Sequence, residues 1–335
     1  MIWLTWRQLR TQAMVAAVFL GVLAVALVVT GLRLAHIYDT SGVATCQANC
    51  QAVADAFLRE ARNGVTGVLF TLLSGAGYVV PAVIGVFWGA PLIARELEAG
   101  THRLVWNQSV TRSRWVATKL LGVGLASIVV TALLSLAVTW WADPIDRIGP
   151  HRVTPDIFAS RGIVPIGYAA FAFALGAAAG VLVRRTVPAM AITLAVVIAA
   201  VVAAPLVIRP HLMTPVRVSV PLTVDNIRGL VMSDQGREMF VEVQADVPGV
   251  WILSNTVVRS DGRPFTGPAN MTACNRDAPA KDCMQWIASL HLRQSLSYHP
   301  ATRFWALQWR EMSLYLGVAA LLALFSYWWV SRRRS

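Results

Sequence analysis

Six long apolar runs separated by polar segments dominate the hydropathy pattern of this chain. The runs cover roughly residues 13–35, 66–94, 120–141, 162–183, 187–208 and 312–330. Each has about the 20 residues that a helix needs to cross a hydrocarbon core about 30 Å thick. Hydrophobic residues make up 56% of the sequence and charged residues only 14%, well below the share usual in soluble domains. The pattern therefore predicts an all-α polytopic membrane protein with six transmembrane helices.

The first 12 residues differ from the apolar run that follows them. Trp3 and Trp6 stand beside Arg7 and Arg10, which favours a short helix lying in the membrane interface over residues 1–12. The alternative is a plain membrane anchor with positive charges on the inner side. The first run is longer than the apolar core of a secretory signal and lacks a clear small-residue cleavage site, so we interpret it as a retained helix.

The arginines indicate how the chain is oriented. With the N-terminus in the cytoplasm, six crossings place the links after the second and fourth runs, and the C-terminus, on the same side. These short segments are rich in basic residues: Arg95, Arg103, Arg112, Arg114, Lys119, Arg184, Arg185, Arg332, Arg333 and Arg334. The arginines of the long last outside segment do not contradict the orientation, because long loops cross the membrane regardless of their charge. We therefore expect a multi-pass membrane protein with both termini cytoplasmic. The formal charge of +12 then reflects topology and contacts with anionic lipids, and no nucleic-acid partner is expected.

All four cysteines lie in segments that this topology places outside the cell. Cys46 and Cys50 fall in the first such segment, and Cys274 and Cys283 in the last. An oxidising compartment favours disulfides. Three pairings are open, of which Cys46–Cys50 with Cys274–Cys283 is the simplest. A zinc site is the competing interpretation, but the sequence has no matching second pair and no histidine cluster.

The last outside segment, residues 209–311, is long enough for a small domain. Val216–Val220, Phe240–Val243 and Trp251–Val258 show apolar character typical of strands, with turn residues between them. Residues 285–310 have a helical pattern that leads into the sixth span. We therefore expect a small α+β extracytoplasmic domain over residues 209–311. The last helix and the basic tail follow it and cover residues 312–335.

Several functions lack the residues they need. Spans two to six hold no Asp, Glu, Lys, Arg or His between their predicted ends, which disfavours an ion-driven secondary transporter. No catalytic constellation, metal-ligand cluster or Walker A loop is present. The chain is therefore not expected to be an enzyme or to bind a cofactor itself, and ATP could act only through a separate subunit. The only sizeable cytoplasmic surface for such a subunit is the polar link 95–119, which lies within the section 13–208.

This link carries a resemblance to a known family. Ala94-Arg-Glu-Leu-Glu-Ala-Gly-Thr101 is followed by Ser109-Val-Thr-Arg-Ser-Arg-Trp-Val-Ala-Thr-Lys119. With six spans and the leading Trp/Arg segment, these motifs resemble the permease subunit of ABC-2 type exporters, up to about residue 210. Residues 298–311 are similar to actinobacterial members more narrowly, whereas the large last outside loop departs from the smallest members.

The resemblance implies how the protein works and with whom. Two permease copies, expected as a homodimer with a heterodimer left open, would join two copies of an ABC ATPase subunit that binds ATP and Mg²⁺. The link 95–119 would be the coupling segment. Its acidic residues would face basic groups of the ATPase, its Gly-Thr pair would form the seating turn, and its basic residues would meet acidic groups or lipid phosphates. These coupling residues are Glu96, Glu98, Gly100, Thr101, Arg103, Arg112, Arg114 and Lys119.

The apolar walls of the spans predict a hydrophobic or amphipathic cargo such as a drug, a lipid or a peptide antibiotic. The resemblance implies that this cargo is moved out of the cell across a bacterial cell membrane, as in multidrug efflux. Phe70, Tyr78, Phe87 and Trp88 are candidate pathway residues. The glycine pairs 85/89 and 176/180 have a spacing that permits close helix packing, within one chain or at a dimer seam. The rival function is a membrane-anchored sensor or assembly factor acting through residues 209–311.

Overall fold

The computed structural model describes residues 2–47, 50–100, 111–149, 151–233, 238–245, 247, 249–274 and 279–332. The chain forms two compact units. We call Met1–Leu212 with Phe304–Ser335 the transmembrane unit, and Met213–Arg303 the 213–303 domain.

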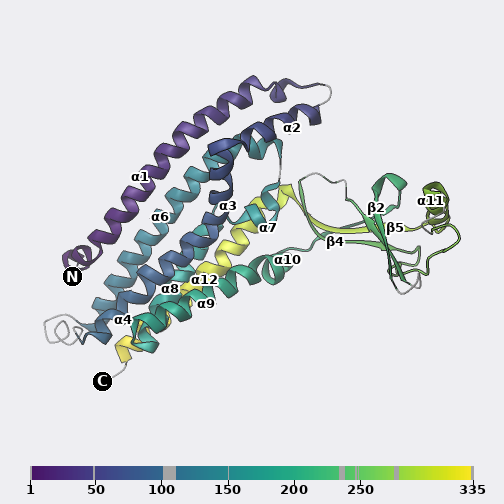
Figure 1. Ribbon diagram of the computed structural model, residues 1–335. Coiled ribbons are helices and arrows are strands. Elements are labelled where there is room, and N and C mark those ends of the chain that lie inside the picture. The colour runs from purple at the N-terminus through teal and green to yellow at the C-terminus, as the bar shows by residue number, and fades with distance from the viewer. Residues whose placement is uncertain are drawn as a thin grey trace. The chain divides into compact units, whose positions relative to one another are not determined.

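The transmembrane unit is built from long helices connected by short helical links (Figure 1). Its long helices are α1 (Ile2–Thr40), α3 (Gly64–Ile84), α6 (Arg112–Ile148), α8 (Val164–Val183), α9 (Thr186–Ala203) and α12 (Phe304–Arg332). Shorter elements are α2 (Cys50–Ala61), α4 (Ala90–Glu98), α7 (Pro155–Phe158) and α10 (Arg209–Leu212), with 3₁₀ turns at Val43–Thr45 and His151–Val153. Two π-helical turns, Gly85–Gly89 and Ala204–Ile208, join α3 to α4 and α9 to α10 without interruption.

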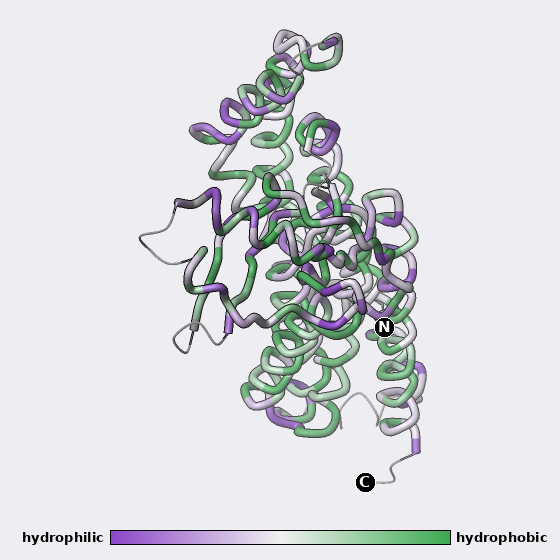
Figure 2. Tube along the Cα trace, turned by 90° about the vertical axis from the view of Figure 1, so that its right-hand side faces the viewer, coloured by the Kyte–Doolittle hydropathy of each residue, from purple (hydrophilic) through white to green (hydrophobic). Residues whose placement is uncertain are grey.

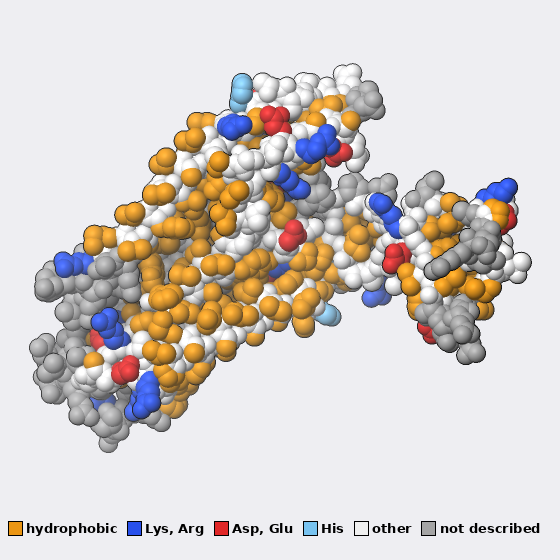
Figure 3. Space-filling model, viewed as in Figure 1, with side chains coloured by type: hydrophobic (Ala, Val, Ile, Leu, Met, Phe, Trp, Pro, Cys, Tyr) orange, Lys and Arg blue, Asp and Glu red, His pale blue; other side chains and the backbone are white. Residues whose placement is uncertain are grey.

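Among the described residues, six helical segments are long and apolar enough to cross a membrane, as the sequence predicts. They are Ala13–Thr45, Gly64–Glu98, Arg112–Ile148, Val164–Val183, Thr186–Leu212 and Ala301–Arg332. Most extend beyond the apolar runs, because the helices continue through polar residues at their ends. Figure 2 shows this arrangement as hydrophobic helical stretches with hydrophilic residues toward their ends, and Figure 3 shows hydrophobic side chains covering the sides of the helices.

The N-terminal segment differs from the sequence expectation. Residues 2–12 continue directly into the first span as part of α1, so they form no separate helix. Their location in the membrane interface stays a prediction.

Helix α8 forms the centre of the transmembrane unit. It contacts α3, α4, α6, α9 and α12, and 78% of its span is buried. Alanine and glycine on all its faces let five neighbours approach closely. A Cβ on Gly176 would lie 2.4 Å from the carbonyl oxygen of Gly85, and one on Gly180 would lie 2.6 Å from that of Ala90. The two glycine pairs therefore meet within this chain rather than at a dimer seam.

In the part that the structure describes, the 213–303 domain contains two antiparallel sheets and one α-helix. Strands β1 (Val216–Pro221), β5 (Arg293–Pro300) and β4 (Val250–Val258) form a sheet in the order β1-β5-β4, and β2 (Ile227–Ser233) pairs with β3 (Glu238–Val243). The helix is α11 (Ala280–Ser289), and 3₁₀ turns lie at Val224–Asn226 and Ala301–Arg303. The α+β class is therefore as expected, and three of the strands match the predicted segments.

One expectation for this domain was wrong. Residues 285–310 do not form a continuous helix, because β5 is the central strand of the larger sheet and separates α11 from α12. The sequence of β5 does not show the pattern of a strand, because one of its buried positions is polar. Gln294 is 1% exposed and bonds to the carbonyl oxygen of Gln244 and to the Asn255 side chain, each at 3.0 Å. A polar residue facing the core removes the apolar alternation by which a strand is identified.

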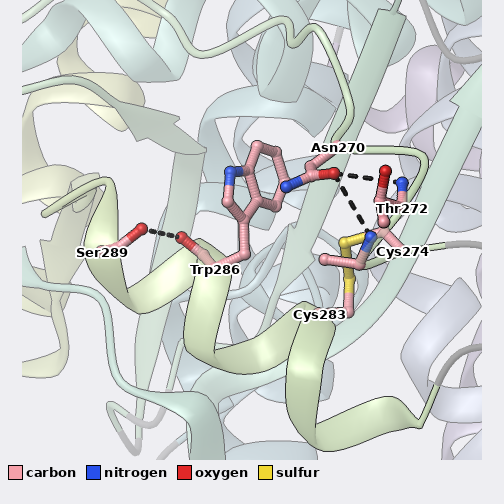
Figure 4. The surroundings of a disulfide bond; sticks show 7 residues. Asn270, Thr272, Cys274, Cys283, Trp286 and Ser289 are labelled. Carbon is pink, nitrogen blue, oxygen red and sulfur yellow. Dashed lines mark hydrogen bonds between the residues drawn. A yellow bond between two sulfur atoms is a disulfide. The ribbon is translucent and has the colours of Figure 1, made fainter.

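Both expected disulfides are present, Cys46–Cys50 and Cys274–Cys283. Cys274 and Cys283 are buried in the core of the domain with Met239, Phe265 and Ile287. Figure 4 shows how this bond attaches α11 to the loop that carries Asn270, whose side-chain oxygen accepts from the backbone of Thr272 and Ala273. The disulfide thus connects the only helix of the described domain to a loop without regular structure.

Replacing Cys274 and Cys283 together by serine is expected to lower the stability of the 213–303 domain by about 2 to 4 kcal/mol, because a short chain loop is no longer closed in the unfolded state. Limited proteolysis should then cut within residues 259–292 at lower protease concentrations than in the unmodified protein. The matched variant with both Cys46 and Cys50 changed to serine should leave cleavage of this region unchanged. Equal resistance of both variants would contradict the assigned role.

Candidate functional site

Polar side chains gather at the two ends of the transmembrane unit. One end, which we call the basic end, holds the C-terminal turn of α4, the start of α6, the α8–α9 link and the end of α12. Its described basic residues are Arg95, Arg112, Arg114, Lys119, Arg184, Arg185 and Arg332. The other end, which we call the opposite end, holds α7, α10 and the start of α12 (Figure 1).

At the basic end, Glu96 and Lys119 form an ion pair that joins α4 to α6. Lys119 also donates to the carbonyl oxygen of Leu92 at 3.4 Å, and its ammonium lies 4.9 Å from the ring centre of Trp115. The lysine side chain is only 5% exposed and the glutamate 14%. The pair therefore holds together the two helices that flank the segment 101–110.

Glu98, the last residue of α4, contacts a different helix. One carboxylate oxygen accepts from the Thr186 backbone N–H at 2.8 Å and from its hydroxyl at 2.7 Å. These bonds satisfy a donor that the first turn of α9 leaves without an intrahelical partner, and a negative charge is favourable at a helix N-terminus. Glu98 thus fastens α4 to the start of α9.

The remaining predicted coupling residues lie around these contacts. Gly100 has a φ of +68°, a conformation that glycine adopts at no steric cost, so it can form the turn expected after α4. Thr111 caps α6 by accepting from the backbone N–H of Arg114. The Arg114 side chain is exposed and that of Arg112 is half-buried. Thr101 and Arg103 lie outside the described residues.

At the opposite end, the centre of the polar cluster is an ion pair between Arg209 and Glu311. The Arg209 Nε donates to one Glu311 oxygen at 2.7 Å and its Nη2 to the other at 3.1 Å. Tyr168 donates its hydroxyl proton to Glu311, and the guanidinium lies 4.0 Å from the ring centre of Phe158. Both charged side chains have 0% exposure. The cluster joins α8, α10 and α12 without access to solvent.

Next to this ion pair, Gln308 of α12 holds the loop between α7 and α8. Its amide oxygen accepts from the backbone N–H groups of Ile163 and Val164, at 2.9 and 2.8 Å. Its amide nitrogen donates to the carbonyl oxygens of Phe158 and Arg161, each at 3.0 Å. One side chain thus satisfies four backbone groups that precede or begin α8.

A second buried ion pair lies in the same region. Arg161 is 3.3 Å from Asp146 of α6 and also donates to the Ser160 hydroxyl. Burial lowers the pKa of the Arg161 guanidinium, and the neighbouring Asp146 carboxylate opposes that shift. The start of α8 is therefore connected to α6 as well as to α12.

Neither buried ion pair is apparent from the sequence, because the predicted spans end before their residues. Arg209 follows the fifth apolar run directly and Glu311 precedes the sixth. In the structure both residues belong to the spanning segments. The statement that spans two to six lack charged residues therefore holds for the predicted apolar runs but not for the helices. Opposite charges directly flanking two apolar runs were the available signal.

The four candidate pathway residues do not line one surface. Phe87 and Trp88 line an apolar groove of about 550 Å³ between α1, α3 and α6. Tyr78 instead donates to the Pro155 carbonyl oxygen and stacks on Tyr168 at the opposite end. Phe70 faces the guanidinium groups of Arg62 and Arg161. Only the first two thus share a cavity. The groove is formed by Val15, Ala16, Phe19, Leu20, Val79, Val80, Val83, Ile84, Phe87, Trp88, Val130 and Leu134.

These features define a polytopic membrane protein with buried polar clusters at both ends of its helices. Within the described residues, no group of three or more His, Cys, Asp or Glu is placed to hold a metal ion. The family model described as ABC-2 membrane transporter related matches residues 17–209. Because the match covers more than half of the 335 residues, the chain belongs to this family. No curated protein and no solved structure gives a significant match.

Membership of this family identifies the chain as a permease component, which is the membrane subunit of a transporter. Permeases of this family associate with an ATPase subunit. The resemblance of the 95–119 link to such permeases is thereby confirmed at the level of the family. The roles of its individual residues stay predictions.

Proposed function

We propose that this chain is the membrane subunit of an exporter driven by separate ATPase subunits, which dock on the link 95–119. The basic end then faces the cytoplasm, as the positive-inside rule favours. Two permease copies and two ATPase subunits form the working unit, and ATP and Mg²⁺ bind in the partner. The apolar groove at Phe87 and Trp88 supports a hydrophobic or amphipathic cargo.

The observation that carries the proposal is the way the link is anchored. Glu96 binds Lys119 on α6, and Glu98 binds Thr186 on α9. A force applied to residues 101–110 therefore acts on the flanking helices α4 and α6, and through Glu98 it also reaches α9. A partner shifts such an equilibrium only by binding one arrangement better than the other. The contacts of Glu96 and Glu98 within the chain support a positioning role for both, in place of the direct ATPase contacts expected from the family.

The ion pair offers a sharp test of that role. Glu96→Ala is expected to lower ATP-driven cargo efflux by about 2- to 30-fold, the range of a coupling change of 0.5 to 2 kcal/mol, while the ATPase still binds. The swap Glu96→Lys with Lys119→Glu should restore part of the loss, because the pair can form again. Efflux from proteoliposomes and co-purification of the ATPase give the two readouts, and Glu60→Ala, an exposed glutamate of α2, is the control.

Loss of ATPase binding in Glu96→Ala, with no rescue by the swap, would instead assign Glu96 to the ATPase interface. Binding and efflux equal to those of the unmodified protein would remove any role for the pair.

The 213–303 domain favours a second candidate function, a sensor or assembly factor, because it is a compact unit with its own core. A response to an external signal that persists after this domain is replaced by a short linker would argue against it. Loss of an external response with efflux intact would support it.

A further inference from the structure

The helix that begins at Thr186 extends from one polar end of the transmembrane unit to the other. Helix α9, the π-helical turn Ala204–Ile208 and α10 run without a break from Thr186 to Leu212, a length of 27 residues. At 1.5 Å per residue this helix is about 40 Å long. It begins at the basic end with the residue that Glu98 holds, and near its other end it carries Arg209 of the buried ion pair.

At its first end, this helix follows α4. Two hydrogen bonds from Thr186 reach the same oxygen of Glu98, one from the backbone and one from the hydroxyl. Glu98 is the last residue of α4, from which the chain continues into the segment 101–110. Any displacement of α4 therefore pulls or pushes on the start of α9.

At the other end, the π-helical turn sets the direction of Arg209. The turn immediately precedes this residue and contains Pro205. A π-helical turn holds one more residue than an α-helical one, so its conversion to α-helix would rotate the residues after it by about 100° around the axis. Such a rotation would remove the guanidinium from Glu311 and Tyr168. The buried cluster is therefore sensitive to a change in the winding of this helix.

The sides of the helix permit movement along its axis. The buried residues of α9 are Ala189, Thr193 and Val197. Ala189 packs in a cluster formed by alanines of α4 and α8. Small side chains leave shallow ridges, over which packed helices can slide by small shear displacements. Besides the ion pair, two hydrogen bonds link the helix to α12. The Tyr315 hydroxyl donates to the Ala200 carbonyl oxygen at 3.2 Å, and Arg310 donates to the Leu212 carbonyl oxygen at 2.6 Å.

We propose that the helix Thr186–Leu212 is a connector that transmits movement of α4 at the basic end to the Arg209–Glu311 pair at the opposite end, and that separating this pair opens that end for cargo. Glu98 and Arg209 are its two positioning residues. The source of the movement rests on the proposed function, but the mechanical link is a property of this chain alone.

The test uses the purified chain in lipid nanodiscs, without an ATPase. Met312→Cys places a thiol next to Glu311 at a position that is 9% exposed, and the four native cysteines are in disulfides. The readout is the rate at which N-ethylmaleimide modifies this thiol. Adding Glu98→Ala is expected to raise that rate at least about threefold, because Glu98 no longer holds the connector at the basic end.

Two matched variants control for local damage. Glu98→Gln keeps a side-chain oxygen that accepts from Thr186 and should label at the unmodified rate. Arg95→Ala removes an exposed side chain one turn earlier on α4 and should also leave the rate unchanged. The double variant Arg209→Met with Glu311→Leu has no ion pair to separate, so adding Glu98→Ala to it should not raise the labelling rate.

An unchanged rate in Glu98→Ala, or an equal rise in Arg95→Ala, would overturn the connector. If Met312→Cys does not fold, hydrogen exchange of residues 204–212 in the chain with its native Met312 replaces labelling and carries the same expectations. A second series adds the ATPase trapped with nucleotide. A rise caused by Glu98→Ala but not by nucleotide would leave the connector standing and reject the proposed function.

Discussion

Replacing Glu311 alone by leucine should destabilise the transmembrane unit by about 3 to 5 kcal/mol, because it leaves the Arg209 guanidinium buried without its carboxylate. The structure makes this cost hard to avoid. Arg209 has 0% exposure, so water cannot take the place of the carboxylate without a rearrangement of α8, α10 and α12. Tyr168 also loses the oxygen to which its hydroxyl donates.

The double variant Arg209→Met with Glu311→Leu is expected to recover most of that stability, because apolar side chains of similar volume need no partner in a buried site. Adding Tyr168→Phe removes the remaining unpartnered hydroxyl. The apparent melting temperature in detergent and the monodisperse fraction after heating measure the series. The control is Asp143→Ala, which breaks the exposed pair with Arg147 and should change stability by less than about 1 kcal/mol.

A double variant no more stable than Glu311→Leu would show that the pair itself stabilises the fold. Recovery of stability in the double variant would instead mean that the two charges serve a purpose other than stability. This outcome agrees with a pair of helices that separates during function.

The sequence predicts the spans well because the hydrocarbon core imposes a length and a composition on each helix. It predicts the helix ends poorly, since a helix continues into polar residues wherever another helix satisfies them. Arg209 and Glu311 are 102 residues apart in the chain, and nothing local indicates that they meet. The same limit applies to Glu98 and Thr186, which are 88 residues apart. The link 95–119 was thus identified as a segment, while the partners of its acidic residues required the structure.

Helix packing around α8 leads to the other large expected effect. Gly176→Ala places a Cβ 2.4 Å from the Gly85 carbonyl oxygen and 2.6 Å from the backbone nitrogen of Ala90. These are backbone atoms of the neighbouring helix, so no side-chain rotation relieves the overlap. Helix α8 and the segment Gly85–Ala90 must therefore move apart by a large fraction of an ångström. We expect a loss of about 1 to 3 kcal/mol or more, the cost usual for overpacking.

Two glycines in the same unit provide the matched control. A Cβ on Gly75 of α3 or on Gly122 of α6 would meet no atom within 4 Å. Gly75→Ala and Gly122→Ala should therefore be neutral, or stabilising by up to about 1 kcal/mol, because alanine favours the helix more than glycine does. Thermal stability in detergent, measured side by side, should separate Gly176→Ala from both controls.

The same variants distinguish internal packing from a dimer seam. If Gly176 and Gly85 meet within one chain, Gly176→Ala should lower the melting temperature of the single permease copy at every protein concentration. If the glycine pairs instead joined two copies, the variant would dissociate a dimer and leave the melting of the separate chain unchanged. Cross-linking at several concentrations, combined with the thermal data, decides between the two, and dissociation without destabilisation would contradict the packing described for α8.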